Sequence, residues 1–141
     1  MVPRMNELKD WNVSELSPLA LAYVGDAVWE VYARNHVLRQ GIRRPKELHR
    51  AATKYVSAIA QARLAAELWD SLTDEEQAVL RRGRNAKSGH VRKNADVLDY
   101  RHSTGFEAVI GYLYGSGNKE RLEQLCRLAL ERADEWKKEQ Q

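Results

Sequence analysis

The sequence has little cysteine, little proline and no long uninterrupted hydrophobic run. Its single thiol, Cys126, excludes an internal disulfide and a paired-cysteine metal site, as is typical of proteins in a reducing cytoplasm. The longest apolar stretch, residues 18–33, contains Gly25, Asp26 and Glu30 and falls short of the roughly 20 residues that a membrane helix needs. Residues 1–11 also lack the apolar centre of a secretory signal. We therefore expect a cytoplasmic protein that does not contact a membrane.

Residues that favour helices are abundant. Ala, Leu, Glu, Arg and Lys dominate the 141 residues, of which 43% are hydrophobic and 30% charged, as in ordinary globular proteins. Capping residues, apolar periodicity and stop signals predict an all-α fold of one domain over residues 1–141, with a loose N-terminal arm at 1–13. The expected helices are 18–40, 46–55, 57–69, one that begins at the capping box Thr73/Glu76 and buries Leu80, 103–114 and 118–138.

Basic residues gather in two segments. Residues 34–54 contain seven Lys or Arg residues and one acidic residue. Residues 81–101 contain seven Lys or Arg residues and two acidic residues, so the two segments together carry +11 in a chain of net charge +3. Such segregation favours a polyanion-binding face, although two solvated helix ends would give the same charges. Residues 83–94 are nearly devoid of apolar side chains, which predicts an exposed, mobile loop.

Two acidic residues fall where the pattern predicts burial. Asp26 lies in the middle of a helix that is apolar on almost every side, and Glu107 is the only acid in the apolar run 106–113. Burying a carboxylate is costly unless a cation or metal ion neutralises it, and neither run contains Lys or Arg. We therefore expect the two acids to face each other and share a divalent ion, Mg²⁺ with Mn²⁺ as a substitute. Ion pairs with distant arginines remain an alternative.

Other catalytic patterns are missing from the sequence. The four histidines have no HxxxH or HExxH spacing, and the glycines form neither a GxGxxG nor a Walker motif. Glu30, one turn beyond Asp26, is a third metal ligand, an exposed residue or an ion-pair partner of Arg34.

Two stretches resemble the ribonuclease III family. Residues 19–28, LALAYVGDAV, are similar to its motif built on Gly-Asp-Ala, and residues 104–112, TGFEAVIGY, look like its second motif, Glu-Ala-hydrophobic-Ile-Gly. The two motifs occur in the family's order and at about its spacing of eighty residues. The resemblance covers essentially the whole chain and is closest to the Mini-III branch, through residues 20–27, 81–89 and 100–108. That branch has no separate domain for binding double-stranded RNA.

The resemblance implies a ribonuclease III-like helical fold, a two-fold homodimer and metal-dependent cleavage of double-stranded RNA. The implied substrate is the precursor of bacterial 23S ribosomal RNA, and a large-subunit ribosomal protein is a further candidate partner. Asp26 and Glu107 match the family's catalytic metal ligands. The side chains best suited to the minor groove and phosphates of an RNA duplex are Arg81, Arg82, Arg84, Asn85, Lys87 and Ser88. A merely solubilising role is the alternative for this segment.

The chain departs from the larger ribonucleases III at three acidic positions, where it has Leu19, Ala22 and Thr104. Such replacements are usual within the Mini-III branch, but they leave the number of metal ions open, and Glu47 matches a further family acid only ambiguously.

A non-catalytic RNA-binding or ribosome-associated module and a plain helical adaptor are the rival functions. The aromatic-rich helices 23–32 and 106–114 are expected near the dimer interface, unless their rings fill the monomer core.

Overall fold

The fold is described by a computed structural model that covers residues 11–86 and 96–139, with side chains as far as Trp136. Every regular element in these ranges is helical, which confirms the predicted all-α class. The elements are η2 (Val13–Glu15), α1 (Pro18–Arg39), α2 (Pro45–Val56), α3 (Ala58–Glu67), η3 (Trp69–Ser71), α4 (Asp74–Asn85), α5 (Val97–Gly115) and α6 (Lys119–Glu139). None of the helices described has the length and hydrophobicity needed to cross a membrane.

Local capping explains where the helices begin. The Ser17 side chain accepts a hydrogen bond from the Ala20 N–H at 3.1 Å, directly before the proline that opens α1. At the start of α4, Thr73 and Glu76 form the predicted capping box. The Glu76 N–H donates to Thr73 Oγ1 at 3.1 Å, and the Thr73 N–H donates to Glu76 Oε1 at 3.0 Å. These two starts are confirmed as the sequence predicted them.

Two predicted boundaries are wrong. Helix α5 begins at Val97 rather than at 103, because the Asp96 side chain caps it by accepting from the N–H groups of Leu98 and Asp99. Helix α4 continues through Asn85, so residues 83–85 form a helical turn and not the start of a loop. The rest of the predicted loop, apart from Ala86, lies at 87–94, outside the described residues.

The N-terminal arm is also more ordered than predicted where it is described. Trp11 and Val13 pack against the core, and a Cβ built at Gly115 would lie only 2.2 Å from the Trp11 ring. The expectation of a loose arm is therefore wrong for residues 11–13, while residues 1–10 lie outside the description.

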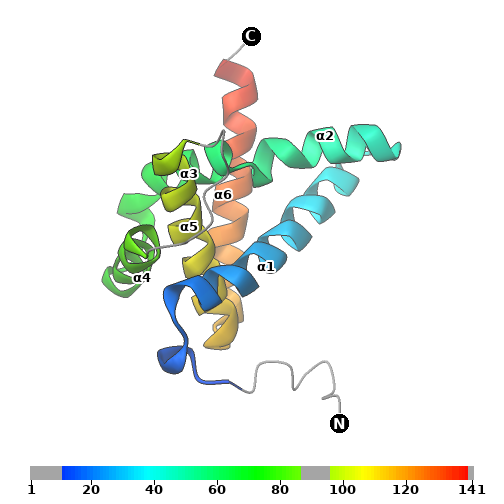
Figure 1. The fold of residues 1–141 in the computed structure, drawn as a ribbon. Coiled ribbons are helices and arrows are strands. Elements are labelled where there is room, and N and C mark those ends of the chain that lie inside the picture. The colour runs from blue at the N-terminus through cyan, green and yellow to red at the C-terminus, as the bar shows by residue number, and fades with distance from the viewer. Residues whose placement is uncertain (1–10, 87–95, 140–141) are drawn as a thin grey trace.

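Helix α5 is the central element, because α1, α3 and α4 all pack against it (Figure 1). The α1–α5 crossing is unusually close. A Cβ on Gly25 would lie 1.7 Å from the Glu107 carbonyl oxygen, and one on Gly111 would lie 1.9 Å from the Leu21 carbonyl oxygen. Only glycine permits such an approach of two backbones.

The packing around this crossing fixes its geometry. Trp29 of α1 is fully buried, meets the Phe106 ring edge-on at a centroid distance of 5.1 Å, and donates from Nε1 to the Tyr55 carbonyl oxygen at 2.9 Å. Farther out, the Asp134 carboxylate on α6 accepts from the Tyr55 hydroxyl at 2.6 Å and contacts His36 Nε2 at 2.8 Å. These contacts join α1, α2, α5 and α6.

Candidate active site

The structure brings Asp26 and Glu107 together at the α1–α5 crossing. Asp26 follows Gly25 on α1, and the Glu107 backbone is the part of α5 that lies against Gly25. The two carboxyl groups are hydrogen-bonded to each other. Two carboxyl groups can share a hydrogen bond only if one of them carries a proton.

The electrostatics of this pair favour a bound proton or cation. The pKa of Glu107 is raised to about 9, chiefly by burial, then by the hydrogen bond and negative charge of Asp26, with a smaller contribution from Glu30. A hydrogen bond from Gln61 acts in the opposite direction. In the metal-free protein Glu107 is therefore protonated at neutral pH.

Asp26 is not buried, contrary to the sequence prediction. Helix α1 turns one apolar face to the core, whereas Tyr23 and Val31 beside Asp26 are 82% and 67% exposed. The apolar pattern marks a helix suited to burial on most sides, but the described residues of one chain cover only one side. Glu107, on the central helix, is half-buried.

The donor set fits a hard divalent cation. Two carboxylates that repel each other supply oxygen ligands, and the exposed side of Asp26 leaves room for water and phosphate oxygens to complete the coordination of Mg²⁺. Glu30 forms an ion pair with Arg34 at 2.8 Å, which is one of the three alternatives that the sequence left open for it. Within the described residues, no group of three His, Cys, Asp or Glu side chains is close enough to hold a metal. Glu47 is exposed on α2.

Sequence reasoning missed Gln61, on α3. This side chain is 2% exposed, its Nε2 donates to the Val56 carbonyl oxygen at 3.1 Å, and its amide reaches Glu107. Its Oε1 is buried without a hydrogen-bond partner, which costs about 1–3 kcal/mol. The only signal in the sequence is one amide in an alanine-rich helix.

The family's other acidic positions add no carboxylate here. Ala22 is buried, and the Thr104 hydroxyl is buried and donates to the Tyr100 carbonyl oxygen of its own helix at 2.9 Å. The site therefore contains two facing acids.

The candidate RNA-binding residues are only partly described. Arg81, Arg82 and Asn85 are exposed and Arg84 is half-buried on the last turns of α4, while Lys87 and Ser88 lie outside the described residues. Gly83, in the same turn of α4, packs against α5. A Cβ added at Gly83 would lie 2.9 Å from the Gly105 Cα and 3.0 Å from the Ala108 Cβ. Because Gly105 and Ala108 flank Glu107 in the sequence, the basic end of α4 meets α5 at the level of the acid pair.

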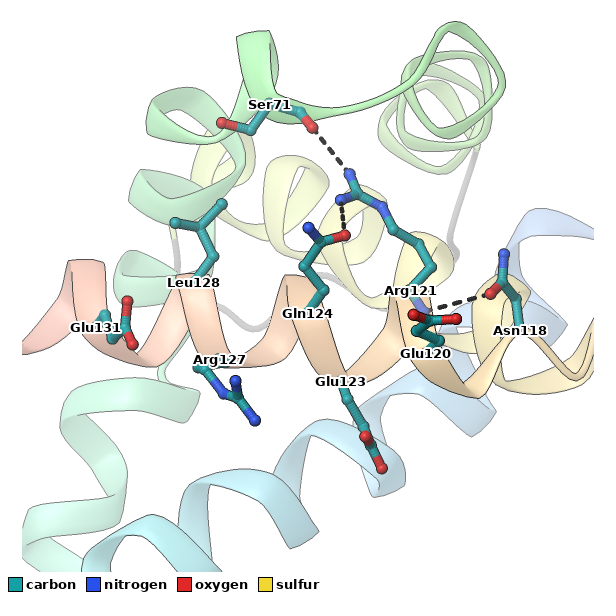
Figure 2. A pocket seen from close by; sticks show the side chains of 9 residues that line it. All are labelled: Ser71, Asn118, Glu120, Arg121, Glu123, Gln124, Arg127, Leu128 and Glu131. Atoms are coloured by element: carbon teal, nitrogen blue, oxygen red, sulfur yellow. Dashed lines mark hydrogen bonds between the residues drawn. The ribbon is translucent and has the colours of Figure 1, made fainter.

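A wide groove lies elsewhere, along α6 (Figure 2). It has a volume of about 740 Å³, and its polar lining includes Arg121, Gln124 and Ser71. Arg121 donates to both carboxylate oxygens of the buried Glu76, at 2.9 and 2.8 Å, and to the Ser71 carbonyl oxygen at 2.8 Å. These bonds tie α6 to the start of α4, and neither Asp26 nor Glu107 lines the groove.

Comparison with known proteins agrees with this geometry. The family model for the ribonuclease III domain matches residues 19–118, which include both acids. The chain is 50% identical over 113 residues to Mini-ribonuclease 3 of Brevibacillus brevis, covering 80% of this chain and 84% of that protein. It is 47% identical over 125 residues to Mini-ribonuclease 3 of Streptococcus pneumoniae, covering 87% of this chain and 98% of that protein.

A solved structure has the same fold. The crystal structure of a protein from Fusobacterium nucleatum superposes with a TM-score of 0.73 at 26% identity, covering 84% of this chain and 95% of the other. The acid pair, the helical fold and the sequence relatives lead to one conclusion: the chain belongs to the ribonuclease III family, alongside the Mini-ribonuclease 3 proteins.

Proposed function

We propose that this endoribonuclease cleaves double-stranded RNA with a divalent cation held by Asp26 and Glu107. The observation that carries the proposal is the meeting of these two carboxyl groups at a glycine-lined helix crossing. A cation at this position would offset the burial of the Glu107 carboxylate and its repulsion with Asp26, which together hold a proton on Glu107 in the metal-free protein.

Asp26 and Glu107 would have different roles in the reaction. When bound, the cation would supply a water of lowered pKa and stabilise negative charge on the scissile phosphate. Asp26, on the solvent side, faces the approaching substrate, and Glu107 anchors the site to the central helix. The Gly25 contact lets the two backbones approach closely at this point, so the side chains of Asp26 and Glu107 start from adjoining segments of α1 and α5.

Duplex RNA is the substrate class that the charge distribution supports. The exposed Arg81 and Arg82 lie at the end of α4 that meets α5 beside Glu107, which suits contact with phosphates flanking a cleavage site. The finer assignment, maturation of precursor 23S ribosomal RNA, with a ribosomal protein as an accessory partner, rests on the resemblance to the Mini-III branch alone.

We further propose a homodimer that covers the open face of α1. Leu19, Tyr23, Ala27 and Val31 are spaced four residues apart and form an exposed apolar stripe beside Asp26. The aromatic rings of α5 support the interface less than expected, because Phe106 is buried in the core and Tyr112 and Tyr114 are half-buried against it. A dimer would present two acid pairs to one duplex, one for each strand.

Removing the charge of either acid should abolish cleavage. We expect Asp26→Asn and Glu107→Gln to reduce the rate of Mg²⁺-dependent duplex cleavage by more than ~100-fold, beyond the effect typical of groups that only support a metal ligand. Folding and duplex binding should be nearly unchanged. Glu131→Gln, on the exposed side of α6, is the control. Near-normal cleavage by either mutant would refute the assignment, and a gel shift without metal-dependent cuts by the wild type would favour the non-catalytic module.

The proton on Glu107 should make the metal-free protein less stable as pH rises. Because the pKa of Glu107 is about 9 in the fold and lower in the unfolded chain, the folded state binds the extra proton between these values, and its stability falls from about pH 5 toward pH 9. Glu107→Gln lacks this dependence, so its Tm advantage should be small at pH 5 and several degrees at pH 8 in chelator. Parallel Tm curves for mutant and wild type would contradict the prediction.

The basic end of α4 should bind phosphates. We expect the triple substitution of Arg82, Arg84 and Lys87 by Ala to weaken duplex binding for all sequences and to flatten the dependence of log K on log salt by about 0.9 per lost contact. The control replaces three other basic residues, Lys46, Arg50 and Lys54, which are exposed on α2. If the slope of log K against log salt is unchanged in the α4 triple variant and reduced in the α2 control, the RNA-binding surface lies on α2 instead.

A charge in the stripe on α1 should break the dimer. Light scattering at micromolar concentration is expected to give a dimeric mass for the wild type and a monomeric mass for Tyr23→Asp, since the mutation places a carboxylate in an apolar contact. Ile59→Asp changes a similarly exposed apolar residue on α3, outside the stripe, and should leave the dimer intact. A monomeric wild type would refute the dimer.

A further inference from the structure

Gln61 differs from the other buried polar side chains of the described residues. Glu76 is satisfied by Arg121, and the hydroxyls of Ser103 and Thr104 both donate to the Tyr100 carbonyl oxygen. Gln61 alone keeps a buried polar side-chain atom, Oε1, without a partner in the part of the chain that is described. A hydrocarbon side chain of similar size would fill the space without that defect, so packing does not account for an amide here.

The bonds of Gln61 point to its role. Its Nε2 donates to the carbonyl oxygen of Val56, the last residue of α2, at 3.1 Å, and its amide interacts with the Glu107 carboxyl, where it lowers the pKa of that group. The corner between α2 and α3 is itself fixed, because the Ser57 side chain caps α3 by accepting from the Ala60 N–H at 3.2 Å. The amide therefore spans from a rigid corner to the more buried acid of the pair.

We infer that Gln61 is a positioning residue that holds the Glu107 carboxylate in its cation-binding orientation. The inference rests on the proposed function, because it assumes a cation at the Asp26–Glu107 pair. Glu107 interacts with both Asp26 and the Gln61 amide, so the amide would restrain rotation of the carboxylate about its terminal bond. Groups that orient a metal ligand in this way affect both metal affinity and turnover.

The test separates positioning from structural support. Gln61→Leu removes the unpartnered oxygen together with the hydrogen bond to the Val56 carbonyl oxygen, and because these two effects oppose each other we expect a Tm close to that of the wild type. Mn²⁺ affinity, measured by calorimetry on the metal-free protein, should fall by roughly 10–100-fold. The kcat for duplex cleavage at saturating Mn²⁺ should fall while the KM for RNA stays unchanged. Gln61→Met, closer in shape, serves if the leucine variant does not fold.

Gln77→Leu is the matched control. Gln77 on α4 also donates from Nε2 to a backbone carbonyl, that of Trp69 at 2.9 Å, and it is not placed at the acid pair. We expect this control to keep wild-type Mn²⁺ affinity and kcat. The inference would be overturned if folded Gln61 variants kept wild-type Mn²⁺ affinity and kcat. It would also be overturned if the Gln61 and Gln77 variants both lost Mn²⁺ affinity and kcat in proportion to their loss of Tm. A wild type whose Mn²⁺ binding is absent, or insensitive to Asp26→Asn, would overturn the proposed function as well.

Discussion

The close crossing of α1 and α5 is the constraint on which the site depends. At Gly25 and Gly111 an added Cβ would come within 1.7 and 1.9 Å of a carbonyl oxygen of the opposite helix, so the two backbones are in contact. The acids beside this contact, Asp26 and Glu107, cannot move apart without separating the helices. The burial of Glu107 and its repulsion with Asp26 are part of the cost of the crossing, and together they raise the pKa of Glu107 to about 9. The buried contact of Trp29 with Phe106 keeps the helices in place against that repulsion.

Local signals made much of the fold predictable. The caps at Ser17 and Thr73 involve residues three apart in the sequence, and both form as expected. The pairing of Asp26 with Glu107 could be anticipated because each acid falls in an apolar run without a cation, and because both match family motifs. The start of α5 was misplaced because its first turn is poor in apolar periodicity, and the Asp96 cap was the signal that should have decided it.

Two features lay beyond sequence reasoning for a physical reason. An apolar helix surface does not reveal whether its own chain or another molecule covers it, so the exposure of Asp26 and Tyr23 could not be predicted. Gln61 acquires its significance from the Val56 carbonyl oxygen and from Glu107, and the second of these contacts spans 46 positions. In the proposed enzyme, the open face of α1 would serve cation, substrate and partner subunit together, which explains why this helix is apolar yet carries an exposed acid.

The most direct test of the central claim is to locate the cation. A crystal of the wild-type protein soaked in Mn²⁺ should show an anomalous scattering peak between the carboxylates of Asp26 and Glu107, within roughly 2.0–2.3 Å of an oxygen from each. The same soak of Glu107→Gln crystals should lose or weaken that peak. A peak elsewhere on the molecule, with the two acids still hydrogen-bonded to each other at neutral pH, would contradict the account.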